Sequence, residues 1–432
     1  MNLFDLPRPF VYGCIFVLGC CFGSFLNVCI HRFPSRYKLW DQLKALNSSR
    51  SGCPKCGAAI QWRDNIPLLG WLMLAGKCRN CRRPISFRYP FVELLTGLLF
   101  VLMYWIEMPP DRYVSIQQAG LYTVLGPQNI TDHLSPDVWL HLRYSLHMMM
   151  ICCLIVATFI DFELRIIPEA CTDPWIVVAI LASTAVGQCF IVPLWFQDLS
   201  VANILREELP SVLKPLMFYW DAVEFAQRHP HLHGFLTSLA GFCMGYGVVW
   251  FVRTAGSRVL RQEAMGEGDV WLMAMIGSVI GWQPVLIAFF IAPLLAIASA
   301  LITWLVRGDR YSPYGPWLSM ATVLVLVGWP TVWPAAKRIF DMGPALVPIA
   351  VFMMSALVVS LQLTQLIKRI LGFPLYYDEE EPTPEWSSAD HLTYYNAERP
   401  DEQTGQWQVS QWPGCRAGRG LSQSYRWRHD SR

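Results

Sequence analysis

The chain has 432 residues, of which 54% are hydrophobic and only 15% are charged. Soluble domains carry about 25% charged residues, so this composition excludes an ordinary soluble protein. The formal net charge is only +2, and we expect no nucleic-acid partner.

Long stretches without Asp, Glu, Lys or Arg recur along the chain, and about 20 apolar residues are enough to cross the hydrocarbon core. The stretches are residues 9–30, 94–106, 144–160, 175–196, 234–252, 270–306, 315–336 and 342–367. Segment 270–306 is too long for one span, and the turn signal Gly281-Trp282-Gln283-Pro284 divides it into two helices. The sequence therefore predicts an all-α polytopic protein of the lipid bilayer with eight or nine transmembrane helices, nine by our count.

Basic residues are unevenly distributed between these spans. Residues 31–90, which follow the first span, carry twelve Lys or Arg and two acids, and loops rich in Lys and Arg stay in the cytoplasm. Counting spans onward places the N-terminus outside and the C-terminus in the cytoplasm. In this topology Asp161 and Asp269 both fall at the cytoplasmic face.

Four of the fourteen cysteines form two pairs in the basic loop, Cys53-Pro-Lys-Cys56 and Cys78-Arg-Asn-Cys81. Two C-x-x-C knuckles at this separation are typical of a structural zinc site, because each presents two sulfurs on a tight turn. The sequence thus predicts a small cytoplasmic, zinc-ribbon-like loop, which we call the four-cysteine loop. A redox pair or reduced structural thiols are the alternatives.

Two aspartates stand at span ends. Asp161 closes the third span, and Asp269 follows Gly266-Glu267-Gly268 at the start of the sixth. An acid at the edge of a membrane segment is a candidate functional residue. Two such carboxylates could hydrolyse a peptide bond, one activating water and the other donating a proton. The alternative is that both are ordinary polar helix ends.

Four stretches of the chain occur in the order found in one known family. They are Gly23–Val28 with His31–Pro34, Cys53–Gly97, Asp161 with Ile167–Glu169, and Met265–Asp269 with Ala274 and Gly277. With these stretches the chain resembles the type IV prepilin peptidases, which are GxGD aspartyl membrane proteases of type IV pili and type II secretion. A further stretch, Pro313-Tyr-Gly-Pro316, looks related.

The resemblance implies an aspartic endopeptidase of the bacterial inner membrane, with Asp161 and Asp269 as the catalytic pair. It implies cleavage of the basic leader of prepilin or pseudopilin precursors. It also implies N-methylation of the new N-terminus with S-adenosylmethionine as donor. The donor site is not identified, although Gly76 and Glu93 are weak candidates, more simply read as a turn glycine and a helix-start acid.

We expect four regions. Residues 1–106 hold two spans and the methyltransferase-associated four-cysteine loop, and residues 107–142 form an external loop. Residues 143–372 form the peptidase core with an external insertion at 197–233, and residues 373–432 form a disordered cytoplasmic tail.

One departure from the family is Trp271, where members usually carry Lys. Two other functions remain open: a presenilin-like intramembrane protease and a non-catalytic zinc-bearing membrane assembly factor.

Overall fold

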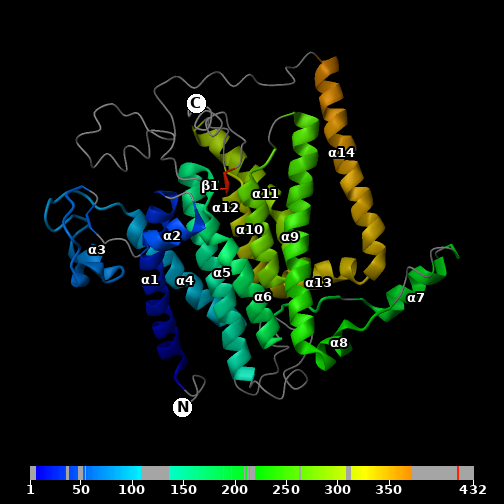
Figure 1. Ribbon diagram of the computed structural model, residues 1–432, viewed down its shortest axis with the longest axis horizontal. Helices are drawn as coiled ribbons and strands as arrows, with labels where there is room; N and C mark the ends of the chain where they lie inside the picture. Colours follow the sequence, from blue (N-terminus) through cyan, green and yellow to red (C-terminus); the bar gives the residue numbers. More distant parts are fainter. Residues whose placement is uncertain are drawn as a thin grey trace.

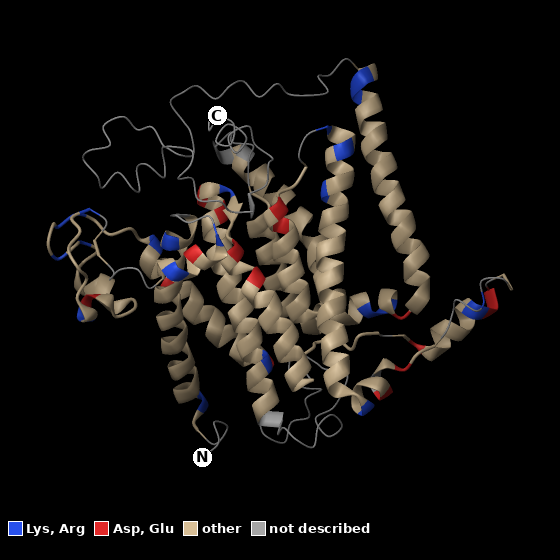
Figure 2. Ribbon diagram, in the orientation of Figure 1, with Lys and Arg blue, Asp and Glu red and all other residues tan. Residues whose placement is uncertain are grey.

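The computed structural model describes residues 6–35, 38–46, 52–53, 55–108, 136–187, 189–195, 197–208, 210–211, 214, 219–261, 264–307, 313–371 and 416–417. Its long helices run roughly side by side as a bundle (Figure 1). Charged residues gather mainly toward the helix ends, and the middle of the bundle is largely uncharged (Figure 2).

The N-terminal helices α1 (Arg8–Arg32) and α4 (Arg88–Glu107) form a close pair. A side chain at Gly19 would come within 2.8 Å of the Gly97 backbone, and one at Gly23 within 2.6 Å of the Glu93 backbone. Small residues of this kind let membrane helices approach closely. The short helices α2 (Leu39–Ala45) and α3 (Leu69–Met73) lie in the loop between the pair.

The central helices are α5, α6, α9, α10 and α11. Helix α5 comprises Pro136–Leu164, α6 comprises Asp173–Val186 and α9 comprises Pro230–Leu260. Helix α10 comprises Glu267–Ile280, and α11 comprises Trp282–Arg307. Helix α10 has only 14 residues, and every residue from Gly268 to Ile280 except Trp271 is buried. Glycines make this possible, because Gly241 of α9 and Gly277 of α10 meet backbone to backbone. The break between α10 and α11 falls at Gly281, whose φ of 88° suits glycine.

The prediction of an all-α polytopic membrane protein is confirmed. Among the described residues, seven helices are long and apolar enough to span a membrane, and a bent pair would make eight. That pair is α12 (Gly315–Val327) and α13 (Trp329–Phe340), which meet at 95°. Sequence 315–336 was expected as one continuous span, but α13 turns away at Gly328. The buried α10, counted as a span from the sequence, is too short to pass the same criterion.

The remaining elements are short or peripheral. They are α7 (Leu199–Glu208), α8 (Ala222–Arg228), α14 (Leu346–Ile370) and the 3-10 turns Phe33–Ser35, Trp62–Asn65, Glu169–Cys171 and Gly343–Ala345. Strands β1 (Ile166–Ile167) and β2 (Arg416–Ala417) pair antiparallel. Most of the expected external loop 107–142, and the expected disordered tail 373–432 apart from β2, lie outside the described residues. The four-region division stays a prediction.

Candidate active site and cysteine cluster

Asp161 and Asp269 come from different helices and are both buried. Asp161 lies in the last turn of α5 and exposes 6% of its surface, while Asp269 lies in the first turn of α10 and exposes 7%. An acid in the first turn of a helix is stabilised by the helix dipole. The two helices contact each other in the centre of the bundle. The fold therefore brings two acids 108 positions apart in sequence to one place.

The two carboxylates converge on Gly315, the first residue of α12. A Cβ atom added to Gly315 would lie 2.6 Å from Asp161 Oδ2 and 3.3 Å from Asp269 Oδ1. The two oxygens are therefore no farther apart than the sum of these distances. The same added atom would lie 3.2 Å from Ile167 Cδ1. The absence of a side chain at Gly315 keeps open the space between the acids.

Backbone groups surround this acid pair. The Gly315 amide bonds to Asp161, and the Gly266 amide bonds to Asp269. Within the described part of the chain, neither aspartate forms an ion pair. The described part of the site thus holds two acids close together with no salt bridge, and the nearest cation identified is Arg165, whose charge acts on Asp161 from one turn farther along the chain.

Other acids near the site are differently placed. Glu163, two residues after Asp161, is 40% exposed at its side chain and pairs with Arg88 of α4. Glu263 lies outside the described residues. Trp271, at the position where a lysine was expected, packs its ring edge-on against Tyr246 at 5.4 Å between centroids. At this position α10 therefore presents an aromatic contact to α9.

The four loop cysteines form one cluster. All four sulfur atoms lie within 4.8 Å of one another, with 3.9 Å between Cys53 and Cys81 and 4.0 Å between Cys56 and Cys78. A zinc–sulfur bond of about 2.3 Å implies sulfur–sulfur edges of about 3.8 Å in a tetrahedron. The cluster could therefore hold a metal ion, and the sulfur geometry fits zinc.

The two knuckles have the same backbone pattern. Cys53 N donates to Ala58 O, and Cys78 N donates to Arg83 O, each at 2.9 Å. Backbone amides of Cys81 and Asn80 lower the pKa of the Cys78 thiol to about 6, whereas burial raises the pKa of the Cys53 thiol to about 11. A thiolate is the metal-binding form of cysteine, and the backbone amides of the second knuckle favour that form.

A second group of buried charges was missed in the sequence. Glu107 ends α4, and its carboxylate lies 2.9 Å from His147 Nδ1 and 3.6 Å from Arg143 Nε. All three side chains are fully buried, and the Arg143 guanidinium lies 5.5 Å from the Trp139 ring centre. Glu107 directly follows the charge-free stretch 94–106, and Arg143 directly precedes the stretch 144–160. From the sequence they were therefore placed in or beside a loop.

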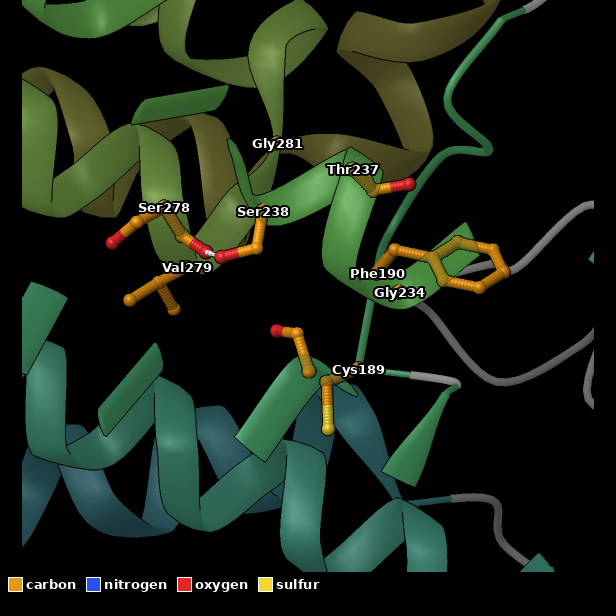
Figure 3. Close-up of a pocket in the computed structure, with 9 residues that line it drawn as sticks. Cys189, Phe190, Gly234, Thr237, Ser238, Ser278, Val279 and Gly281 are labelled. Atoms are coloured by element: carbon orange, nitrogen blue, oxygen red, sulfur yellow. Dashed lines mark hydrogen bonds between the residues drawn. The ribbon is translucent and has the colours of Figure 1, made fainter. Parts of the chain in front are cut away.

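A small gap between helices lies elsewhere. It is lined by residues of α6, α9 and α10, and there the Ser238 hydroxyl donates to the Ser278 carbonyl at 2.6 Å (Figure 3). Gly281, just beyond the end of α10, also lines it. The gap is therefore at the end of α10 opposite to Asp269, and we assign it no function.

Gly315 was also not predicted as a site residue. The signal was present in Pro313-Tyr-Gly-Pro316, because a glycine between a bulky residue and a proline at a helix start is a special backbone position. Nothing in the sequence alone indicates that this turn faces the two aspartates.

Comparison with known proteins assigns a family. Residues 17–106 match the model of the bacterial peptidase A24 N-terminal domain, and residues 199–301 match that of the type IV leader peptidase family. Asp269 lies in the second matched region, and Asp161 lies between the two.

Curated relatives agree with these matches. The type 4 prepilin-like proteins leader peptide-processing enzyme of Escherichia coli O78:H11 is 31% identical over 71% of this chain and 90% of its own length. The prepilin leader peptidase/N-methyltransferase of Klebsiella pneumoniae is 29% identical over 65% of this chain and 90% of its own length. The enzyme of that name from Myxococcus xanthus is 28% identical over 68% of this chain, and the match spans 63% of its length. No solved structure matches.

The apolar helices and these matches thus define a polytopic membrane peptidase. The chain belongs to the type IV leader peptidase family, as the resemblance in its sequence indicated.

Proposed function

We propose that this protein cleaves the basic leader of type IV prepilins or pseudopilins by an aspartyl mechanism, at the cytoplasmic face of the inner membrane. The observation that carries the proposal is the convergence of Asp161 and Asp269 on Gly315. Family membership supports the peptidase activity, and the names of the curated relatives support the substrate class.

Two close carboxylates with little exposure to water favour a state in which they share one proton. The ionised aspartate accepts a proton from water as the water oxygen attacks the scissile carbonyl carbon. The protonated aspartate donates to the carbonyl oxygen. The tetrahedral intermediate then collapses and the C–N bond breaks. The leaving amine takes a proton from the aspartate that activated the water, and a hydroxyl of the intermediate returns a proton to the other aspartate, which restores the shared proton.

Gly315 has a specific part in this scheme. Any side chain there would fill the space beside Asp161 Oδ2, where the scissile bond must lie to reach both acids. Asp161 and Asp269 also lie at helix ends rather than mid-span. A substrate whose apolar helix follows a basic leader would present the junction between the two at this depth.

The second activity is N-methylation of the new N-terminus, with S-adenosylmethionine as the implied donor. The relatives named for both activities support it. We place it with the loop between α1 and α4, where Cys53, Cys56, Cys78 and Cys81 would hold a structural zinc ion. The zinc would fix the two knuckles together, because so small a loop has little core of its own.

The experiment for the peptidase compares Asp161→Asn and Asp269→Asn with the unchanged protein, each co-expressed with a prepilin. Asp41→Asn, at an exposed acid of α2, is the matched control. We expect both site variants to leave the prepilin uncleaved and the control to process it fully. Normal cleavage by either site variant would refute the aspartyl mechanism.

The zinc assignment has its own test. Elemental analysis should find about one zinc per chain in the purified protein, and none in a Cys53→Ser, Cys56→Ser variant. Equal zinc in both preparations would remove the assignment. A mature product without an added methyl group would restrict the proposed function to proteolysis.

A further inference from the structure

The four-cysteine loop carries an apolar surface that no described part of the chain covers. Leu69, Leu72 and Met73 of α3 are 55%, 63% and 69% exposed. Residues spaced by three and four positions share one face of a helix, so these three form a single outward face. Trp62, in the preceding 3-10 turn, is 82% exposed. We call these four residues the α3 face.

The opposite side of α3 is held against the rest of the loop. The Trp71 indole N–H donates to Ile85 O at 3.4 Å, and its ring packs edge-on against Phe87 at 6.0 Å. At the start of the helix, Leu68 N donates to Glu93 Oε2 of α4 at 2.7 Å. The α3 face is therefore directed outward by fixed contacts to the loop and to a membrane helix.

The loop that carries this face is rich in exposed basic residues. Leu69–Met73 contains no charged residue, and α3 shows none in Figure 2. Among the described residues 55–87, the one acid is Asp64, which pairs with Arg79. The exposed basic residues of this segment, in addition to Arg79, are Lys55, Arg63, Lys77, Arg82 and Arg83. An apolar face on a loop that is rich in exposed basic residues suits a membrane surface that contains anionic lipid.

Helix α4, which follows the loop, also has an exposed apolar side. Phe87 is 64% exposed, and Phe91, Leu94 and Leu98 follow at 43%, 40% and 54%. Their spacing of three and four residues makes one stripe that runs from the loop along α4. In Figure 1, α3 lies beside the bundle, close to the ends of α1 and α4 that the loop joins.

We propose that α3 lies in the headgroup region of the cytoplasmic leaflet and binds anionic lipid. Trp62, Leu69, Leu72 and Met73 enter the boundary between headgroups and acyl chains, and the basic residues of the loop contact lipid phosphates. This contact holds the four-cysteine loop at the membrane boundary. The proposal rests on the exposure of the α3 face and on the cytoplasmic placement of residues 31–90. It does not depend on the roles of Asp161 and Asp269.

The test is hydroxyl-radical footprinting of the full-length protein in lipid nanodiscs, read residue by residue by mass spectrometry. Met73 is the reporter, because methionine oxidises readily. Met353 of α14 is the matched reference, since it is also exposed, at 52%, but lies within a span. Nanodiscs of phosphatidylcholine alone are compared with nanodiscs that also contain phosphatidylglycerol.

We expect oxidation of Met73 to fall several-fold when phosphatidylglycerol is present, while that of Met353 stays low in both. Leu69→Gln with Leu72→Gln should abolish the protection of Met73, whereas Ile204→Gln on the exposed face of α7 should not. Retained metal content and an unchanged melting temperature would show that the double variant is folded.

Three results would overturn the proposal. One is oxidation of Met73 that does not change when the anionic lipid is added. Another is protection that arises only after a prepilin peptide is supplied, which would assign the face to substrate. A third is protection only in discs that hold two protein copies, which would assign it to self-association. Because the readout is not catalytic, a failed cleavage assay would leave this test unaffected.

Discussion

Two of the buried acidic sites in the described part of the bundle differ in the charges that surround them. At one, Asp161 and Asp269 lie together without an ion pair in the described part of the chain. At the other, Glu107 is enclosed with Arg143 and His147. Helix α5 contributes to both, and the fourteen residues from His147 to Asp161 correspond to about 21 Å along its axis.

On the proposed mechanism, this contrast separates a reactive arrangement from a structural one. A buried acid beside cations is neutralised, and its main effect is to join the helices that carry the partners. Two buried acids beside each other repel when both are ionised, so one of them readily holds a proton. Sites of that second kind cost stability and are maintained for chemistry. The two sites should therefore respond in opposite ways when a carboxylate is removed.

The largest effect is expected at the acid pair. Asp269→Asn should lower the cleavage rate by about 10³-fold or more, and the double variant with Asp161→Asn should lose no more than either single variant, because the residues act as a unit. The same substitution should raise the free energy of unfolding by about 1–2 kcal/mol, since it replaces a buried ionisable carboxyl group with a neutral amide. Cleavage kinetics and thermal unfolding of one preparation measure both. A variant that is both inactive and destabilised would contradict this interpretation.

Removing the carboxylate from the other site should have the opposite effect on stability. Glu107→Gln removes the carboxylate that faces the buried Arg143 guanidinium and the His147 ring, so we expect the free energy of unfolding to fall by about 3 kcal/mol. Cleavage per folded molecule should change little. Thermal unfolding in detergent, combined with activity normalised to folded protein, measures this. The control is Glu107→Gln with Arg143→Met, which should recover part of the loss; a double variant less stable than the single one would show that the pair does not act as proposed.

Gly315 tests the space between the acids without altering either acid. Gly315→Val should reduce cleavage by about 10²-fold, because misplacing reacting groups by about 1 Å has an effect of that size. Gly315→Ala should have a smaller effect. Gly247→Ala is the control, since a Cβ there meets nothing within 4 Å. Steady-state kinetics on a prepilin peptide would show the difference, and full activity of Gly315→Val would place the substrate elsewhere.

The smallest effect is expected at Glu163, which lies next to the acid pair in sequence but is partly exposed. Partly exposed ion pairs such as that with Arg88 contribute about 1 kcal/mol or less. Glu163→Gln should therefore keep cleavage within about twofold and change stability only slightly. The measurement is the same kinetic assay. A loss comparable to that of Asp269→Asn would mean that Glu163 belongs to the reacting group.

The spans and the cysteine cluster could be predicted because each depends on local signals. Charge-free stretches of sufficient length identify membrane helices whatever their neighbours, and two C-x-x-C turns bring their own sulfurs together. The same approach failed at 315–336, where the helix turns at Gly328 although no charge interrupts the stretch. Sequence analysis also missed the burial of Glu107. Its partners lie on another helix, and in the sequence alone an acid at the end of a span looks like a loop residue.

The sequence by itself determined that this protein lies in a membrane, which loop carries the cysteines, and which two aspartates stand at span ends. Hydrophobicity and short spacings encode these properties, since each involves residues close together in the chain. Tertiary structure alone decided that Asp161 and Asp269 converge on Gly315, that Arg143 lies by Glu107, and that the α3 face turns outward. The first two depend on helices that are distant in the chain, and the third depends on contacts between the loop and α4, so no local pattern in the sequence encodes them.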